Sequence, residues 1–129
     1  MRIEALLIEK SGGIICEKLA SPKYPQNVGK IRCVGGRREP GETPADTIIR
    51  ELKEEYGIKI LRTDIGEELG PGRIGTRRFA VSAPIGIVGR ASLEGGWSQL
   101  VRVAADAVPE MWQREEAGVQ AYTATPLGR

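Results

Sequence analysis

Segment 43–57 of this chain specifies an α-helix at both of its ends. Thr43 is a suitable N-cap, Pro44 suits the first helical position, and Asp46 completes a capping-box pattern three residues after Thr43. Gly57 stands where a left-handed C-terminal cap is required. At about 100° per residue, an apolar stripe runs along one side of this helix and predicts the face that packs on the core. The stripe consists of Ala45, Ile49, Leu52 and Tyr56, with Ile48 at its margin.

Three glutamates lie close together on an adjoining face of the same helix. Glu51, Glu54 and Glu55 are related as i, i+3 and i+4, so their Cβ atoms are neighbours about 5–6 Å apart. A hard divalent cation would turn the repulsion between them into a binding site, because Mg²⁺ takes carboxylate oxygens. Glu42, just before the helix, could add a ligand or hold Arg50 in place. The alternative is a solvated helix face with an Arg50–Glu54 ion pair, and the glutamates alone leave both interpretations open.

The chain contains no histidine. This absence excludes Ser-His-Asp and Cys-His nucleophilic systems, imidazole zinc sites and a histidine general base. Two cysteines, Cys16 and Cys33, are too few for a tetrahedral thiolate site, and we interpret them as buried thiols within strands. If the chain is an enzyme, its acid–base chemistry falls to carboxylates, lysine or tyrosine.

Apolar runs on both sides of the helix predict a single α+β domain over residues 1–129. Strands are expected at 2–9, 14–19, 30–34, 58–65, 73–82 and 84–88. The first two form a hairpin, segment 30–34 ends at Gly35-Gly36, and 73–82 returns antiparallel to 58–65 across a Gly-Pro-Gly turn. From Trp97 the apolar spacing favours a helix through Ala107. Pro109 either ends that helix or starts another that reaches about Ala117, and 119–125 could be an edge strand.

Residues 36–58 read GRREPGETPADTIIRELKEEYGI. At every position this segment resembles the signature of the Nudix hydrolases, G-x5-E-x7-R-E-U-x-E-E-x-G-U, in which U is a bulky aliphatic residue. The fixed positions are Gly36, Glu42, Arg50, Glu51, Glu54, Glu55 and Gly57, and the aliphatic ones are Leu52 and Ile58. A chance match somewhere in the chain is on the order of one in 10⁸.

The resemblance implies an α/β/α sandwich with a mixed, largely antiparallel sheet, in which this segment forms a loop–helix–loop. Family members cleave a pyrophosphate bond in a nucleoside diphosphate linked to another group, using Mg²⁺ or Mn²⁺. Carried over to this chain, the resemblance makes Glu51, Glu54 and Glu55 metal ligands, assisted by the carbonyl of Gly35. It also implies that Arg50 orients Glu51, that Glu42 and Gly36 support the site, and that Gly57 lets the chain leave the helix.

A carboxylate must accept the proton of the attacking water, since no histidine is available. Glu54 is a candidate inside the signature. In many family members a glutamate outside the signature does this, and Glu94, in the loop before Trp97, is the first candidate of that kind. The alternative for Glu94 is an ordinary surface position.

Arginines outside the helix are candidates for contact with substrate phosphates. They are Arg37 and Arg38 before the helix, and Arg73 and Arg77 after it. Arg77 and Arg78 must point to opposite faces of a strand, so one of the two at most faces the site. For Arg73 and Arg77 the alternative is that they are solvated charges at the edge of the sheet. Trp97 and Trp112 could stack on a nucleobase or pack in the core.

The short chain best fits an enzyme that acts on small (deoxy)nucleoside triphosphates. ADP-ribose or nucleotide-sugar cleavage is the alternative substrate class, and a nucleotide-binding regulatory domain without turnover is an alternative of another kind. Nineteen basic and 17 acidic residues give a net charge of +2, which argues against a nucleic-acid partner. No signal peptide or run of transmembrane length is visible, so we expect a cytoplasmic protein without a membrane partner. A homodimer is compatible with the sequence.

Overall fold

The structure is a computed structural model, which describes residues 1–20, 28–29, 31–69 and 74–104. Its elements, in chain order, are β1 (Arg2–Ile8), β2 (Ile14–Leu19), β3 (Ile31–Arg32), β4 (Val34–Arg37), α1 (Pro44–Tyr56), the 3₁₀ turn η2 (Arg62–Asp64), β5 (Ile65–Leu69), β6 (Thr76–Ser82) and β7 (Ser98–Val103). This order confirms the predicted α+β class.

The seven strands among the described residues belong to one mixed sheet. Its main path runs β3-β2-β1-β6-β5, with β4 paired to β1 and β7 paired to β2. β1 and β6 are parallel over their full lengths, whereas the other strand pairs are antiparallel. The sheet is therefore mixed and largely antiparallel, as the resemblance implied.

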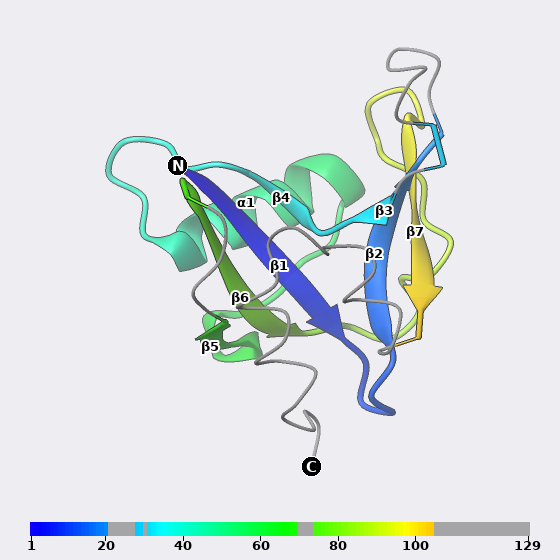
Figure 1. Cartoon of the computed structure of the whole chain (residues 1–129), viewed down its shortest axis with the longest axis horizontal. Helices are drawn as coiled ribbons and strands as arrows, with labels where there is room; N and C mark the ends of the chain where they lie inside the picture. Colours follow the sequence, from blue (N-terminus) through cyan, green and yellow to red (C-terminus); the bar gives the residue numbers. More distant parts are fainter. Residues whose placement is uncertain (21–27, 30, 70–73, 105–129) are drawn as a thin grey trace.

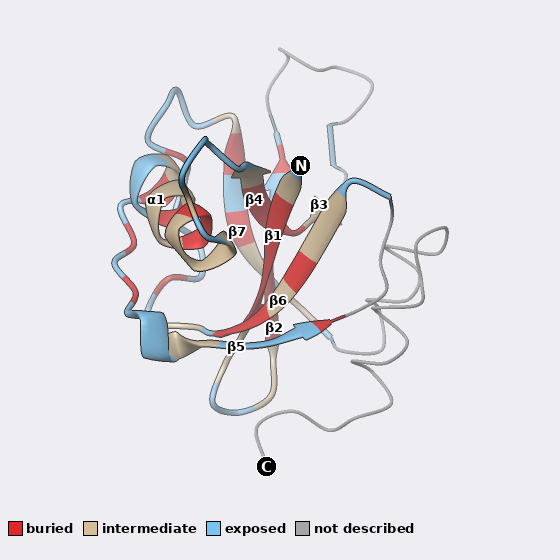
Figure 2. Ribbon diagram, turned by 90° about the vertical axis from the view of Figure 1, so that its left-hand side faces the viewer, coloured by how far each residue is buried: buried red, intermediate tan, exposed pale blue. Residues whose placement is uncertain are grey.

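Helix α1 packs on one face of this sheet, and the largest apolar cluster lies between the two (Figures 1 and 2). Leu52 and Tyr56 of the helix are fully buried among core residues of β1, β4, β6 and β7. Ile48, expected at the margin of the apolar stripe, is buried too, whereas Ile49 is only partly buried. Burial of each such side chain stabilises the fold by about 1.5–3 kcal/mol. No second helical layer is present among the described residues.

The prediction of one strand at 30–34 was wrong at its end. The chain changes partner at Cys33, and β4 then continues through Gly35 and Gly36 to Arg37 while it pairs with β1. A Cβ atom on Gly35 would lie 2.3 Å from the carbonyl oxygen of Ile3. Gly35 therefore permits a close approach of β4 to β1 instead of ending the strand.

The expected strand at 58–65 was also wrong. Ile58 and Ile60 are buried without strand pairing, and the chain makes a 3₁₀ turn before β5 begins at Ile65. The turn is closed by Asp64, whose side chain accepts a hydrogen bond of 2.8 Å from the backbone of Leu61. β5 and β6 are antiparallel as expected, although β6 starts at Thr76 rather than at residue 73.

Segment 84–88 forms turns instead of the expected strand, and Gly86 within it has a φ of 82°. After Trp97 the chain forms β7 and not a helix, paired with β2 from Leu19↔Ser98 to Ile14↔Val103. Ser98 and Leu100 are buried while Gln99 between them is exposed, so burial alternates over the first three residues of the strand. The elements expected after residue 104 lie outside the described residues.

Two smaller expectations concern the cysteines and the membrane. Cys16 and Cys33 are free thiols, and both are buried as predicted. Among the described residues no helix is long and apolar enough to cross a membrane.

Candidate active site

Helix α1 begins and ends where the capping residues predict. The Thr43 side chain accepts a hydrogen bond from the Asp46 backbone at 3.2 Å, and the Asp46 carboxylate accepts one from the Thr43 backbone at 2.9 Å. Gly57 adopts the left-handed conformation with a φ of 66°, and its N–H donates to the Lys53 carbonyl. These caps fix the helix that carries the three glutamates.

Arg50 is the central residue of an ion-pair network beside the helix glutamates. Its Nε and Nη2 donate to the two oxygens of Glu42 at 2.7 and 3.0 Å, and its Nη1 donates to Oε1 of Glu51 at 2.8 Å. Nη2 also donates to the Arg37 carbonyl, which joins the network to the end of β4. The Arg50 guanidinium lowers the pKa of Glu42 to about 2. Glu42 thus holds Arg50, and Arg50 holds one oxygen of Glu51.

The Glu51 carboxylate lies directly against the backbone of Gly36. A Cβ atom on Gly36 would approach that carboxylate to 2.3–2.6 Å, so any other residue at position 36 would displace the Glu51 side chain. Burial raises the pKa of Glu51, and the contact with Arg50 opposes this rise. The glycine of the signature therefore leaves the space that the Glu51 carboxylate occupies beside β4.

Glu55 has a buried carboxylate oxygen, Oε2, with no hydrogen-bond partner in the described part of the chain. Burial raises the pKa of this carboxyl to about 8, and the nearby charges of Glu17 and Glu51 add to the effect. Burying a carboxylate without a partner costs free energy, so this oxygen requires either a bound cation or a proton. A hard divalent ion fits this group and the neighbouring carboxylate of Glu51.

A cavity of about 310 Å³ brings residues distant in sequence to these glutamates. It is lined by Arg2, Arg32, Gly35, Gly36, Glu51, Glu55, Glu94 and Trp97. The structure therefore places the loop candidate Glu94 beside two of the three helix glutamates. Glu54 is not in the lining: its side chain is 58% exposed and lies 3.4 Å from Arg50. Within the described residues, no three acidic or thiol side chains are already gathered as a cation cage.

Glu94 is held near the helix by its own turn. The backbone N–H of Leu93 donates to the Glu55 carbonyl at 2.7 Å, and the Gly96 N–H closes the turn on the Ser92 carbonyl. Gly95 and Gly96 both have positive φ, which permits a tight reversal before β7. The turn precedes a strand instead of the expected helix, but Glu94 still reaches the cavity.

Three of the four arginines expected to contact phosphates do not line this cavity. Arg77 makes two contacts with Glu68, at 2.9 and 2.6 Å, on the exposed β5–β6 pair, and Arg38 donates to the Glu42 carbonyl. Arg37 contributes its carbonyl to the Arg50 network, and none of these three side chains lines the cavity. Arg73 lies outside the described residues.

Sequence reasoning missed a buried polar group beneath the cavity. Glu17 is 0% exposed, and its carboxylate accepts hydrogen bonds from the Tyr56 hydroxyl at 2.7 Å and from Arg32 Nε at 2.5 Å. The Tyr56 hydroxyl also lies 2.5 Å from Ser98 Oγ. Burial raises the pKa of Tyr56, and the charge of Glu17 raises it further. The sequence signal that could have revealed this group is the charge of Glu17, because Glu17 lies on the same inward side of β2 as Ile15.

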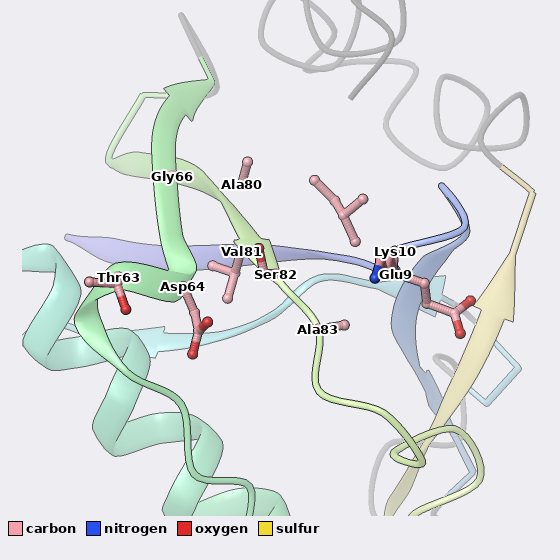
Figure 3. Close-up of a pocket in the computed structure, with 10 residues that line it drawn as sticks. Glu9, Lys10, Thr63, Asp64, Gly66, Ala80, Val81, Ser82 and Ala83 are labelled. Atoms are coloured by element: carbon pink, nitrogen blue, oxygen red, sulfur yellow. The ribbon is translucent and has the colours of Figure 1, made fainter. Parts of the chain in front are cut away.

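A larger hollow, of about 470 Å³, lies at the other end of β1 (Figure 3). Its lining includes Lys10, Thr63, Asp64 and Ser82, and it contains none of the signature residues. We place the chemistry in the smaller cavity because it contains the orphaned carboxylate oxygen.

The metal-free protein is expected to lose stability as the pH rises from about 5 to about 8. An unfolded glutamate titrates near 4.5, whereas Glu55 in the fold has a pKa of about 8. Between these values the unfolded chain has released a proton that the folded chain retains, so rising pH favours unfolding. Thermal melts in EDTA across this range measure the slope. Glu55→Gln should flatten it, and an unchanged slope in that variant would contradict the assignment.

Comparison with known proteins gives one family and one curated relative. The family model of the NUDIX domain matches residues 5–88. An octanoyltransferase of Myxococcus xanthus is 32% identical over 92 residues, which cover 65% of this chain and 26% of that protein. The chain thus spans about a quarter of the length of this relative.

Solved structures with the same fold are numerous. A MutT protein from Methanosarcina mazei matches with a TM-score of 0.68 at 16% identity, over 95% of this chain and 91% of the other. The E. coli ORF135 protein matches with a TM-score of 0.65 at 22% identity, over 99% and 91%. The hydrolase RenU from M. smegmatis matches with a TM-score of 0.59 at 16% identity, over 95% and 83%. At these identities the likeness concerns the fold.

Proposed function

This chain belongs to the Nudix family, and we propose that it is a pyrophosphohydrolase that cleaves (deoxy)nucleoside triphosphates with Mg²⁺ or Mn²⁺. The family as a whole hydrolyses nucleoside diphosphate-linked compounds and uses divalent metal ions. The observation that carries the proposal is the orphaned, buried oxygen of Glu55 in a cavity shared with Glu51 and Glu94.

The residues proposed to hold the metal are Glu51, Glu54, Glu55 and the carbonyl of Gly35. A divalent ion held there supplies positive charge to the phosphate oxygens and lowers the pKa of a bound water. Arg50 holds Oε1 of Glu51, so the second oxygen of that carboxylate is available to a ligand. Glu42 acts on the site through Arg50, as a positioning residue.

Hydrolysis requires a group that accepts a proton from the attacking water. We assign this role to Glu94, since it lines the cavity, and assign Glu54 to metal binding at the rim. Water attacks one phosphorus of the triphosphate, the bond to the leaving pyrophosphate breaks, and the proton passes to a Glu94 oxygen. The products are a nucleoside monophosphate and pyrophosphate.

Glu94→Gln is expected to lower kcat by about 10²–10⁴-fold, because the amide cannot accept the proton. Metal affinity should change little in this variant, whereas Glu54→Gln should raise the Mg²⁺ concentration needed for half-maximal rate. Steady-state rates against Mg²⁺ concentration separate the two effects. Glu67→Gln, an exposed position on β5, is the matched control. Full turnover by the Glu94 variant would remove it from the mechanism.

The proposed substrate class is tested by the release of phosphate or pyrophosphate from a nucleotide panel. The panel contains ribo- and deoxyribonucleoside triphosphates, ADP-ribose and nucleotide sugars, each assayed with Mg²⁺ and with Mn²⁺. We expect the triphosphates to react fastest and to release pyrophosphate. Faster cleavage of ADP-ribose or of a nucleotide sugar would replace the proposed substrate. Tight binding without turnover would indicate a regulatory domain.

A further inference from the structure

Two arginines outside the signature line the same cavity as the glutamates. Arg2 comes from the start of β1, and Arg32 comes from β3. The cavity is thus bordered by three carboxylates, Glu51, Glu55 and Glu94, and by two guanidinium groups. A cavity that presents charges of both signs suits a ligand in which a polyanion is bound together with a cation.

Arg32 is fixed by contacts with Glu17 and Trp97. Its Nε donates to the fully buried carboxylate of Glu17 at 2.5 Å, and its guanidinium lies over the Trp97 ring, 5.4 Å from the centroid. The terminal nitrogens Nη1 and Nη2 donate to no group in the part of the chain that the structure describes. The side chain remains 42% exposed. These donors are therefore both oriented and accessible.

Arg2 is held in a similar way. Its Nε donates to Glu4 Oε2 at 2.9 Å, and Glu4 is itself buried and paired with the buried Arg78 at 2.9 Å. Its Nη2 lies 3.5 Å from the Cys33 carbonyl, at the limit of a hydrogen bond, and its side chain is 34% exposed. Each arginine is thus anchored through Nε by a buried carboxylate of β1 or β2.

We propose that Arg2 and Arg32 form an anion-binding pair that holds the phosphate groups of the substrate beside the glutamates. This inference rests on the proposed function and names the part of the substrate that the two arginines bind. Guanidinium groups bind phosphate through charge-assisted, often paired hydrogen bonds. Because both side chains are already ordered by Glu4, Glu17 and Trp97, binding costs less conformational entropy than it would for free arginines.

The pair also explains why charges are buried beneath the cavity. Glu17 fully buried against Tyr56 gains little stability from its ion pair, since desolvation offsets much of the attraction. Its effect on Arg32 is geometric, because the contact fixes Nε while Nη1 and Nη2 donate to no group among the described residues. Trp97, whose ring lies under the guanidinium, restricts the same side chain further.

The test measures binding of inorganic pyrophosphate to the purified full chain by calorimetry, in Mg²⁺ and in EDTA. Arg32→Ala would leave the buried charge of Glu17 unpaired and could unfold the protein, so two gentler changes are used. Arg32→Lys keeps the charge and loses the planar donors, and the double variant Glu17→Gln/Arg32→Gln removes both charges together. Arg2→Gln tests the second arginine. Arg102→Gln is the matched control, because this exposed arginine pairs with Glu9 away from the cavity.

We expect the double variant and Arg2→Gln each to weaken pyrophosphate binding at least about tenfold, with a smaller loss for Arg32→Lys. The loss should persist in EDTA, where no metal contributes, and Arg102→Gln should bind like the wild type. With a nucleotide substrate the same variants should raise KM and leave kcat nearly unchanged. A purely structural role would not raise KM while it leaves kcat nearly unchanged.

Wild-type affinity in folded variants would overturn the inference, and so would a wild-type chain that does not bind pyrophosphate. Melting curves of every variant establish that it is folded. The proposed function fails by a different result, namely no nucleotide turnover by a wild-type chain that still binds pyrophosphate through Arg2 and Arg32. The two failures are therefore distinguishable.

Discussion

Glu55→Gln is expected to fold normally and to lose nucleotide hydrolysis by about a thousandfold, which is ~4 kcal/mol of transition-state stabilisation. The physical reason is the loss of the buried, orphaned oxygen that we propose as a metal ligand. An amide is nearly isosteric with the carboxylate, but it carries no charge to hold a divalent ion. Initial rates at saturating nucleotide, measured across a wide range of Mg²⁺ concentrations, give the effect.

The same substitution should stabilise the metal-free protein at pH 8, because it removes a carboxylate that burial and neighbouring acids disfavour. Loss of activity together with a gain in melting temperature would distinguish a functional ligand from a structural residue. Glu67→Gln on β5 serves as the control and should change neither quantity. Near-normal turnover by the Glu55 variant would refute the proposed metal site.

The helix could be predicted from the sequence because its determinants are local. Thr43, Asp46 and Gly57 satisfy the backbone groups at its two ends, and these contacts involve residues at most five positions apart. The position of the glutamates on one face follows from helix geometry alone. This part of the site therefore needs no knowledge of the sheet.

The strands after the helix were predicted less well because their structure depends on distant partners. Segment 98–103 has apolar spacing compatible with a helix, and its pairing along the whole of β2 makes it a strand. Similarly, Gly35 and Gly36 resemble a strand end, whereas contact with β1 and with Glu51 explains both glycines. The periodicity of the sequence gives no information about these contacts.

The same reason explains why Glu17 and Arg32 were missed and why the role of Trp97 was left open. Glu17, Arg32 and Trp97 are far apart in sequence, and they meet only because β2 has β3 on one side and β7 on the other. Each residue alone is a charged or aromatic strand position with an ordinary structural interpretation. Arg32 and Trp97 line one cavity with Glu55, and the buried Glu17 holds Arg32 there, so the combination indicates a substrate-binding role that no single residue suggests.

Arg50→Met is expected to lower the free energy of unfolding by about 2 kcal/mol. Methionine fills a similar volume, but it leaves the partly buried carboxylates of Glu42 and Glu51 without their shared cation and frees the Arg37 carbonyl. Because Arg50 lowers the pKa of Glu42 to about 2, the wild type should also lose stability as the pH falls from about 4.5 to about 2. The variant should lack much of that acid-side slope.

Urea denaturation at pH 7 and at pH 3 measures both effects of Arg50→Met. Arg102→Met is the matched control, since Arg102 makes a comparable two-contact pair with Glu9 on an exposed surface, where such pairs contribute little to stability. Turnover of the Arg50 variant should fall as well, because Glu51 is no longer held against Gly36. If Arg50→Met and Arg102→Met changed stability equally, the network around Arg50 would be a surface ion pair, and the helix caps and apolar stripe alone would hold Glu51 in the site.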